Sequence, residues 1–402
     1  MSLKVMKKFT MLRNKGKYVF KSDLAETKYV SPNIRIYTVT TFKDFKDFYQ
    51  VPWLVYKGDE YWIAPLWPEI RDFFKRKNPF WTHADTRLFI VYKDDIAVGR
   101  VAAIVDYMYC KTVGEKAGFF GFFECILDYK IFSALLTLSQ KWLASKGMSV
   151  MRGPINGRVD VGCGFLYKGF NSAPSLLLSY SPKYYLDFAK KFKMKKSRDQ
   201  LAYYLDLTRS IPDHLKEEAK RCESKGVKIR GFNRLRTGKE MKWWVKMMMD
   251  TFSEHWGYVP ISDDEVKTRF GIKKLKWIVD SRLFLVAEID NQPIGFQWST
   301  PDYSQVFKKM NGKLGVAGIL KFLWYKQKIN QGKFNFIGSL KEYRNQSIAS
   351  YMNYCTILEM KKRGYTGVDI GWIDEHNTAS LRIIEKMGAK LYKKFRVYEK
   401  TI

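Results

Sequence analysis

The segment Arg87-Leu-Phe-Ile-Val91 recurs 195 positions later as Arg282-Leu-Phe-Leu-Val286. A short polar turn follows each occurrence, and a second apolar run then begins around Gly99 in one case and Gly295 in the other. Runs of β-branched and aromatic residues on either side of turn residues are typical of a β-hairpin. Because repetition of a supersecondary unit marks a repeated architecture, the recurrence predicts two copies of one fold.

Further correspondences follow the hairpin in the same order in both halves. Each half next contains a long helical pattern, residues 128–146 or 347–363, and a glycine ends each pattern, Gly147 or Gly364. Glycine directly after the last apolar-periodic residue is the expected end of a helix. A strand, a shorter helix and a closing strand complete each half. The predicted strands are residues 148–152 and 200–207 in the first half, and 367–372 and 395–400 in the second.

The spacing of these correspondences locates an insertion and a domain boundary. The offset is 195 residues at the hairpin, 217 at the long helix and 195 again at the shorter helix, so the second half has gained about 22 residues before its long helix. A chain of 402 residues is long for one core and sufficient for two. We predict two domains, residues 1–208 and 209–402, with the boundary at the polar segment that contains Pro212.

Three short motifs stand in register in the second half. Arg344-Asn-Gln-Ser347-Ile-Ala349 follows a predicted strand at 333–340, and Asn377-Thr-Ala-Ser380 and Glu385-Lys-Met-Gly388-Ala389 come later. With the order of strands and helices, these motifs resemble the GCN5-related N-acetyltransferase (GNAT) superfamily, although Ser347 stands where that family has glycine. The resemblance is motif-specific over the last ~60 residues. It implies an α/β (α+β) fold with two tandem acyl-CoA N-acyltransferase domains, each a central mixed, mostly antiparallel sheet flanked by helices.

The resemblance also implies a site for acetyl-CoA or another acyl-CoA as co-substrate. Unpaired N–H groups and the helix dipole make a helix N-terminus attractive to phosphate, provided that small residues leave the approach open. The ordinary alternative is a strand-turn-helix connection with a serine cap. The residues that the resemblance assigns to cofactor binding are Leu340, Arg344, Asn345, Gln346, Ser347, Ile348, Ala349, Ser350 and Asn377.

The corresponding turn of the first half is different. It contains no glycine, it has bulky apolar residues, and it places Glu124 and Asp128 where phosphates would lie. Like charges repel strongly in a partly dry site. We therefore expect the first domain to have lost cofactor binding and to form one wall of a shared cleft. The glycine-rich loop 153–171 is expected to reach across that cleft; the alternative is a solvated excursion.

The resemblance implies direct attack of a substrate amine on the thioester, which requires a base and an acid. Many relatives place a tyrosine as acid two residues before the lysine of Glu-Lys-x-Gly, but this position is Ile384 here, and the strand 333–340 carries no carboxylate. The remaining catalytic candidates are Glu342, Tyr343, Tyr398 and His255. Each also has a structural explanation: packing, a helix N-terminal charge or a loop histidine. Proton transfer through water or from the first half is the alternative.

Composition limits the other classes of function. The net charge of +31 divides evenly, with +15 on residues 1–208 and +16 on 209–402, so the whole surface is basic. Such a surface would steer anionic partners, CoA phosphates, nucleic acid or an anionic membrane, although a lysine-rich proteome alone would also produce it. Five scattered cysteines and four dispersed histidines indicate reduced thiols and no metal site. With no signal-peptide pattern at the start, we expect a cytoplasmic protein.

The inserted segment 303–341 contains eight lysines and no acidic residue. Its longest apolar stretch, residues 314–325, is too short to span a bilayer. The apolar face of this stretch comprises Leu314, Ile319, Leu320, Leu323 and Trp324. A basic amphipathic helix can lie on an anionic membrane or against RNA, but more often it packs on its own domain, and we expect packing here.

Three functions remain after these arguments. The first is an acyl-CoA-dependent N-acyltransferase acting on a small-molecule or peptide amine, which the predicted phosphate turn favours. The second is an aminoacyl-tRNA-dependent aminoacyltransferase, a class that also pairs two such domains, with the basic surface holding tRNA. The third is a non-catalytic acyl-CoA-binding scaffold, which the absent tyrosine would suit. The sequence does not indicate the acceptor, the acyl chain or an oligomeric state.

Overall fold

The computed structural model describes residues 17–20, 27–271 and 279–402. The strands of the first half are β1 (Thr27–Ser31), β2 (Ile34–Thr38), β3 (Ala84–Lys93), β4 (Ile96–Asp106), β5 (Ala117–Cys125), β6 (Val150–Gly153), β7 (Phe165–Lys168) and β8 (Lys195–Asp206). Its helices are α2 (Phe42–Val55), α3 (Trp67–Phe73), α4 (Tyr107–Val113), α5 (Tyr129–Ser145) and α6 (Tyr184–Lys191), with short 3₁₀ helices η1 (Pro79–Thr82) and η2 (Val159–Val161).

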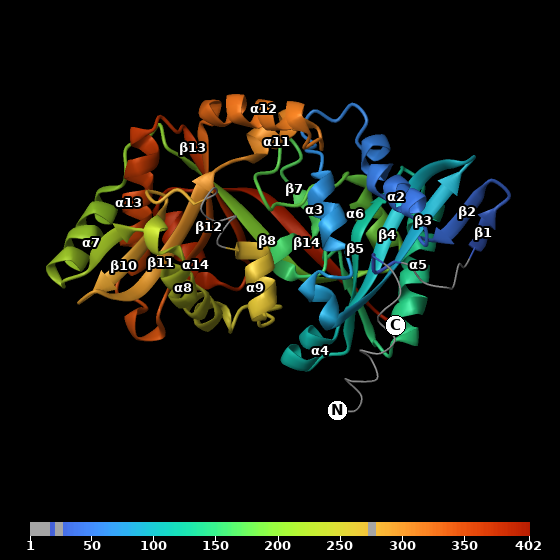
Figure 1. Ribbon diagram of the computed structural model, residues 1–402, viewed down its shortest axis with the longest axis horizontal. Helices are drawn as coiled ribbons and strands as arrows, with labels where there is room; N and C mark the ends of the chain where they lie inside the picture. Colours follow the sequence, from blue (N-terminus) through green and yellow to red (C-terminus); the bar gives the residue numbers. More distant parts are fainter. Residues whose placement is uncertain (1–16, 21–26, 272–278) are drawn as a thin grey trace.

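The second half repeats the order of a hairpin, a third strand, a long helix and a fourth strand (Figure 1). Its strands are β9 (Lys228–Gly231), β10 (Phe284–Ile289), β11 (Gln292–Pro301), β12 (Gln331–Ser339), β13 (Gly367–Asp374) and β14 (Lys390–Thr401). Its helices are α7 (Asp213–Ser224), α8 (Thr237–Phe252), α9 (Asp263–Phe270), α11 (Ser304–Met310), α12 (Val316–Tyr325), α13 (Ile348–Lys362) and α14 (Thr378–Lys386), with η3 (Arg234–Arg236), η4 (Lys326–Lys328) and η5 (Lys341–Tyr343).

The two predicted hairpins are confirmed. β3 pairs antiparallel with β4, and β10 pairs antiparallel with β11. The two turns use the same backbone conformation: Asp94 and Asp95 have φ of 49° and 63°, and Asp290 and Asn291 have φ of 51° and 61°. Two consecutive left-handed residues match the right-handed twist of the flanking strands. The turn residues Asp and Asn tolerate this conformation better than most side chains do.

The strands of both halves join in one 14-stranded sheet within the described residues. The order along the sheet is β1-β2-β3-β4-β5-β6-β14-β8-β13-β12-β11-β10-β9, with β7 paired beside β14. The closing strands are therefore exchanged: Leu205 of β8 pairs with Val368 in the second half, and Tyr398 of β14 pairs with Gly153 in the first. β8 and β14 also pair with each other. The prediction of a mixed, mostly antiparallel sheet flanked by helices is confirmed, and the exchange of closing strands adds to it.

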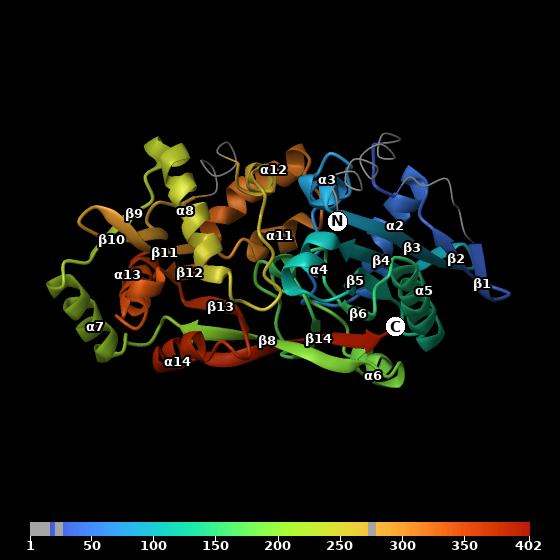
Figure 2. The ribbon, with the colours of Figure 1, turned by 90° about the horizontal axis from the view of Figure 1, so that it is seen from below.

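Helices cover both faces of this sheet. Figure 2 shows α8 and α12 on one side, and α14 and α6 on the other. On the α8 side, Trp244 packs its ring edge against Phe296 and Trp298, with centroids 6.1 and 5.4 Å apart. On the α13 side, Met352 is fully buried in a cluster with Ile294. Burial of these large apolar side chains on each face supplies the main driving force for folding.

In each half, the long helix connects two parallel strands along the chain, and these two strands pair only at one end. β12 pairs with β13 over residues 331–334 and 367–370, and β5 pairs with β6 over residues 117–119 and 150–152. Beyond these residues each pair of strands separates.

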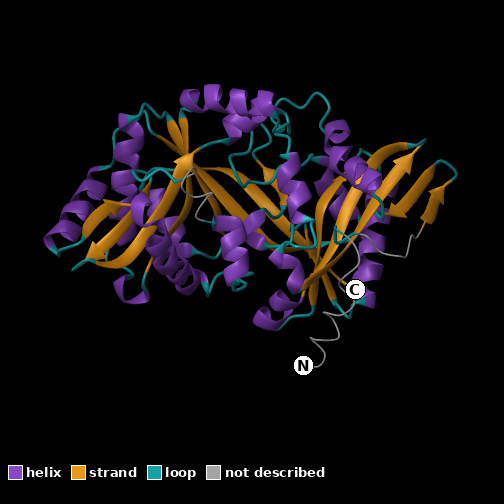
Figure 3. Ribbon diagram, in the orientation of Figure 1, coloured by secondary structure: helices purple, strands orange, loops and turns teal. Residues whose placement is uncertain are grey.

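Figure 3 shows α12 as a separate helix outside the sheet. The prediction that its apolar face packs on its own domain is wrong, because Leu320 and Trp324 are both exposed by more than 60%.

Candidate functional site

The turn between β12 and α13 is the segment that the sequence singles out for phosphate binding. The 3₁₀ helix η5 leads into it, and α13 begins at Ile348. Asn345 and Ser347 both adopt left-handed backbone conformations, with φ of 63° and 60°. Glycine is favoured in this region because a Cβ atom crowds the following carbonyl there. The glycine of the family pattern therefore suits the conformation that Ser347 adopts.

The amides of this turn are left without acceptors. The Ser347 side chain makes no capping hydrogen bond, and the first bond into the helix runs from the N–H of Tyr351 to the carbonyl of Ser347, at 2.9 Å. Within the described part of the chain, the N–H groups of residues 346–350 make no hydrogen bond to an acceptor outside α13. Unpaired amides and the helix dipole together create a site for an anion.

The side chains around these amides leave the turn accessible and positively charged. Arg344, Asn345 and Gln346 are exposed, whereas Ile348 and Ser350 are buried beneath the turn. The ammonium of Lys341 lies 2.6 Å from one carboxylate oxygen of Glu254, and Arg344 lies 3.4 Å from the other. Hydrogen bonds from Lys341 and Arg344 lower the pKa of Glu254. All three side chains are more than a third exposed, so a more highly charged anion can displace the carboxylate.

His255 and Asn377, both predicted from the sequence, lie in contact. Asn377 Oδ1 accepts the N–H of Ser380 and caps α14, so its Nδ2 faces His255 Nε2 at 3.3 Å. Because an amide nitrogen donates, Nε2 is the accepting nitrogen of the imidazole. Burial, partly offset by the Phe252 carbonyl and by Asp374, lowers the pKa of His255 below its ordinary 6.5. The neutral imidazole is the favoured form at neutral pH.

The first half contributes to the same site through its closing strand. Arg198 of β8 lies 3.7 Å from the buried Asp374, and its guanidinium stacks over the ring of Trp256 at 5.5 Å. Gln200 of the same strand donates to Asp374 at 3.4 Å. Strand exchange therefore brings polar side chains of the first half next to the residues that flank His255.

The structure disperses the other catalytic candidates. Glu342 is exposed, and its carbonyl accepts the side-chain amide of Gln346 at 3.0 Å. Tyr343 is half-buried against an apolar cluster of α7 and α13, and Leu340 packs towards α8. Tyr398 lies in the core of the first half, with its ring 6.1 Å from that of Phe165. His255 is thus the candidate base that lies beside a second predicted site residue.

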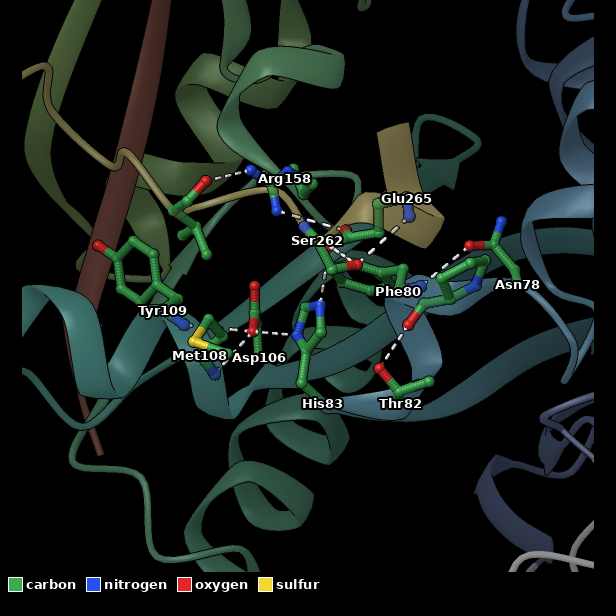
Figure 4. Close-up of polar contacts among 12 residues, drawn as sticks. Asn78, Phe80, Thr82, His83, Asp106, Met108, Tyr109, Arg158, Ser262 and Glu265 are labelled. Carbon is green, nitrogen blue, oxygen red and sulfur yellow. Dashed lines mark hydrogen bonds and ion pairs between the residues drawn. The ribbon is translucent and has the colours of Figure 1, made fainter. Parts of the chain in front are cut away.

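The loop after β6 crosses to the second half, as the sequence predicts. Arg158 donates to the carbonyl of Val259 at 2.5 Å, and it lies 3.5 Å from Glu265 (Figure 4). Asp160 in the same loop pairs with Arg269 at 2.7 Å. These contacts fix the segment that follows His255 against the first half.

A half-buried histidine, His83, completes this contact between the halves (Figure 4). His83 Nδ1 lies 2.8 Å from Asp106, and Nε2 lies 3.6 Å from Glu265 of α9. Burial opposes charge on the ring, but hydrogen bonds to Asp106 and Glu265 outweigh it and raise the pKa of His83 to about 9. Burial likewise opposes ionisation of Glu265, yet hydrogen bonds from His83 and Ser262 and the charge of Arg158 lower its pKa to about 2. The His83 ring is therefore cationic and the Glu265 carboxylate anionic at neutral pH.

In the first half, the equivalent space between β5 and β6 is filled by the chain itself. The N–H of Ile155 donates to the carbonyl of Phe120 at 2.8 Å, and the N–H of Phe122 donates to Asn156 Oδ1 at 2.6 Å. A Cβ atom on Gly121 would lie 2.2 Å from the carbonyl oxygen of Ile155, so the loop needs glycine there. The loop after β6 thus occupies the space beside the ends of β5 and β6 where the two strands separate.

The two carboxylates of the first-half turn also have internal partners. Asp128 caps α5 by accepting the N–H of Lys130 at 2.8 Å. Glu124 accepts hydroxyl hydrogen bonds from Tyr56 and Tyr185, at 2.9 and 3.1 Å. Burial raises the pKa of Glu124 to about 7, against the opposing charge of Arg100 and these two hydrogen bonds. The first-half turn therefore carries two carboxylates, and one of them, Asp128, already accepts an N–H group at the N-terminus of α5.

Three residues of the site were missed by the sequence analysis: Glu254, Asp374 and Arg198. Glu254 and Asp374 each lie within three positions of a predicted residue, His255 or Asn377, and this proximity was a usable signal. Arg198 reaches the site only because the closing strands are exchanged, and no local sequence pattern reports that exchange.

The described residues contain neither a candidate metal site nor a candidate membrane span. No group of three or more His, Cys, Asp or Glu side chains in that part of the chain could hold a metal ion. No helix in residues 17–20, 27–271 or 279–402 is long and apolar enough to cross a membrane.

Comparison with proteins of known sequence identifies two relatives that match along nearly their whole length. The chain is 29% identical over 378 residues to the bacterial ceramide synthase of Caulobacter vibrioides (strain NA1000 / CB15N), covering 92% of this chain and 98% of the relative. It is 28% identical over 386 residues to protein YghO of Escherichia coli (strain K12), covering 94% and 98%. No family model matches the chain.

Comparison with solved structures tests the fold. A tandem GNAT protein from the clavulanic acid biosynthesis pathway, solved without AcCoA, superposes with a TM-score of 0.55 at 9% identity. The match covers 92% of this chain and 98% of that one. This fold agrees with the sequence prediction of an enzyme of the acyltransferase class, and the Caulobacter relative bears the name of a synthase. The described residues therefore adopt the fold of tandem GCN5-related N-acetyltransferases.

Proposed function

We propose that the chain is an N-acyltransferase that moves an acyl group from acyl-CoA to the amine of a long-chain base. The uncapped N-terminus of α13 carries this proposal, because its free amides and its two cationic side chains fit a pyrophosphate. The proposal assigns the acyl-CoA to the second domain, residues 209–402. The first domain, residues 1–208, holds none, since Asp128 and the loop after β6 occupy the corresponding positions.

The residues proposed to hold acyl-CoA are those of the turn and the α14 cap. The amides of residues 346–350 and the cations Lys341 and Arg344 meet the phosphates, while Asn377 lies beside His255 further along the site. Ser347 stays compatible with this role, because its side chain makes no cap bond that a phosphate would have to break.

The class of acceptor is proposed from the relative named a bacterial ceramide synthase, which matches 98% of its own length. A ceramide is the amide of a fatty acid with the amino group of a long-chain base. This reaction is an N-acyl transfer to an amine, the class that the phosphate turn supports independently.

The proposed step joins one amine and one thioester. The neutral amine nitrogen attacks the thioester carbonyl carbon, the carbon–sulfur bond breaks, and the CoA thiolate leaves and takes up a proton. We propose that His255 removes the proton that the amine loses on forming the amide, because its imidazole is favoured in the neutral form. Arg198 and Asp374, at the edge of the same site, are proposed to position the acceptor.

Calorimetry with CoA and with a long-chain acyl-CoA tests the cofactor assignment. Ser347→Asp places a carboxylate among the free amides of α13. Two like charges about 5 Å apart cost about 3 kcal/mol at an effective dielectric constant of 20, so we expect about 100-fold weaker binding. Ser133→Asp adds the same charge near the N-terminus of α5 and should leave CoA binding unchanged.

Two results would contradict the proposed acyl-CoA site, and two others would favour an alternative function. Absence of wild-type binding at millimolar CoA would exclude the proposed acyl-CoA site, and equal binding by Ser347→Asp would exclude its location. Release of free CoA thiol in the presence of a long-chain amine then tests catalysis; CoA binding without thiol release would indicate a non-catalytic scaffold. Binding of tRNA with a steep dependence on salt, without CoA binding, would favour aminoacyl transfer instead.

A further inference from the structure

Helix α12 presents an apolar face to solvent. Its outward side chains recur at helical spacing and, together with Leu314 just before the helix, are between 44% and 79% exposed. They are Leu314, Val316, Ile319, Leu320, Leu323 and Trp324. We refer to these six side chains as the α12 patch. Isolated apolar residues are common on protein surfaces, whereas a contiguous patch marks an interaction site.

The opposite side of α12 already secures the helix to the protein. Phe322 stacks on Tyr303 with ring centroids 5.7 Å apart, and Phe322 and Tyr325 pack on a cluster formed by Val306, Met310 and Ile329. Gly318, also on this side, is buried. The α12 patch is therefore not required to hold the helix in place, and its exposure needs another explanation.

The turn before α12 fixes the position of the helix on the molecule. Trp53 of α2 donates to Asn311 Oδ1 at 3.1 Å, and the N–H of Trp67 donates to the carbonyl of Gly312 at 3.3 Å. Gly312 has a φ of 75°, and a Cβ atom there would lie 2.8 Å from the Trp53 ring, so this contact needs glycine. The α12 patch is thus presented by a segment that both halves hold in place, along one edge of the molecule (Figure 1).

The charges of the inserted segment that carries the patch all have one sign. Residues 303–341 contain eight lysines and no acidic residue. Lys313, Lys321 and Lys326 are exposed within or beside the helix, and the ammonium of Lys328 lies 5.0 Å from the Trp324 ring centroid. An apolar stripe bordered by lysines, with a tryptophan at its end, is the pattern of a helix that lies in a membrane interface.

We propose that α12 docks the protein on a bilayer that contains anionic lipids. The aliphatic side chains of the α12 patch enter the boundary between headgroups and acyl chains, and the surrounding lysines meet the lipid phosphates. Aliphatic side chains make up most of the patch, which favours a membrane over RNA, since RNA sites use aromatic and polar side chains for stacking and base contacts. This inference does not depend on the proposed acyl transfer.

Sedimentation with lipid vesicles tests the docking without any substrate present. The full chain is expected to bind vesicles of mixed phosphatidylcholine and phosphatidylglycerol, and to bind phosphatidylcholine alone at least about tenfold more weakly. Leu320→Glu with Leu323→Glu should weaken binding at least about tenfold, because two charges would enter the apolar boundary. The matched control is Ile96→Glu with Leu127→Glu, two exposed apolar residues outside α12, and we expect it to bind like wild type.

A second pair of variants tests the electrostatic part. Replacing Lys313, Lys321 and Lys326 by Gln should weaken binding to the anionic vesicles at least about tenfold, since each lysine near the surface contributes about fivefold. Replacing Lys130, Lys141 and Lys190 of α5 and α6 by Gln changes the net charge equally and should have little effect. Figure 2 places α6 on the opposite side of the sheet.

Three outcomes would overturn the proposal. The first is equal binding to neutral and anionic vesicles; the second is equal loss in the α12 variants and their controls. The third is no vesicle binding by the wild type; burial of the α12 patch by self-association or by homopolymeric RNA would then identify a different partner. Because these measurements omit acyl-CoA, loss of vesicle binding and loss of CoA binding are separate results. All the substituted side chains are exposed, and unchanged thermal unfolding of each variant would show that the fold is intact.

Discussion

Helices α5 and α13 occupy the same place in the two halves, yet their N-termini differ. At α5, Asp128 accepts a backbone N–H and the loop after β6 fills the space between the strands. At α13, Ser347 caps nothing, and the following amides have no acceptor within the described residues. A helix N-terminus attracts phosphate in proportion to the donors that its own chain leaves free. Under the proposed function, one topology keeps an anion site in the second half and loses it in the first through a capping residue and one loop.

The two halves also differ in what their carboxylates do. Glu124 of the first half is buried among Tyr56, Tyr185 and Arg100, and it serves the core. Glu254 of the second half is exposed and bridges Lys341 and Arg344, the two cations that the proposed function assigns to the phosphates. Burial of a charge fixes a structure, whereas an exposed ion pair can exchange partners at little cost.

The largest effect that we predict concerns the proposed base in the second half. His255→Gln should lower kcat/KM for acyl transfer by about 10²- to 10³-fold, because a positioned base contributes this much to proton transfer. His376→Gln, an exposed histidine nearby, is the control and should keep the wild-type rate. Measurement of thiol release with saturating acyl-CoA would check both variants.

The pH dependence of the rate provides a second readout for His255. The proposed base acts in its neutral form, and burial lowers its pKa below 6.5, so the wild-type rate should fall only when the pH drops below 6.5. This acidic limb should be absent in His255→Gln. A wild-type rate in His255→Gln would assign the proton transfer to water or to the first half. The two halves would then no longer differ by a catalytic base in the second half.

The next effect tests whether Glu124 belongs to the core. Its pKa of about 7 lies above that of an unfolded glutamate, so the folded state holds the extra proton between about pH 4.5 and pH 7. Stability from this group is therefore present at low pH and is lost as the pH rises through 7. Relative to Glu124→Gln, the wild type should lose about 2–3 kcal/mol of unfolding free energy between pH 5 and pH 8. Urea denaturation at the two pH values measures this difference.

A pH-independent difference between these two proteins would contradict the burial of Glu124. It would mean that the carboxylate is solvated, and the first-half turn could then accept a cation or a ligand. The control is Glu254→Gln in the second half, which is exposed and should show no comparable dependence between pH 5 and pH 8.

Much of this fold was predictable because its signals are local. The hairpin turns at Asp94 and Asp290 and the helix-ending glycines Gly147 and Gly364 specify structure through neighbouring residues. The exchange of β8 and β14 was not predictable, because either closing strand can pair antiparallel with either half and the choice depends on tertiary packing. Tyr398 illustrates the consequence, since a candidate chosen for the second half lies in the core of the first.

The site and the inserted helix show the same limit. The sequence predicts Ser347 in a glycine position, and the structure gives it a left-handed φ of 60°. The pairing of Glu254 with Lys341 and Arg344 depends on how the end of α8 approaches the turn, which no local pattern encodes. For α12, the periodicity correctly predicts a helix, but periodicity alone does not tell whether an apolar face meets protein or solvent.

A smaller effect tests the capping difference directly. Asp128→Ala removes the cap of α5 and should cost about 1 kcal/mol of stability without changing CoA affinity. Ser347→Ala, the matched change at α13, should alter stability by less than about 0.5 kcal/mol because no cap bond is lost. Thermal unfolding and calorimetry on the two variants check both statements. A change of CoA affinity in Asp128→Ala would mean that the first half also binds the ligand.

The last effect concerns the backbone of the α13 turn. Ser347 has a left-handed conformation that costs an L-residue about 1–2 kcal/mol, whereas glycine adopts it freely but loses more entropy on folding. Ser347→Gly should therefore stabilise the fold by about 0.5–1 kcal/mol and keep or tighten CoA binding. Ser133→Gly, in the ordinary helical backbone of α5, should destabilise by a similar amount. If both variants destabilise alike, Ser347 does not carry the strain, and the open turn of α13 must owe its shape to other contacts.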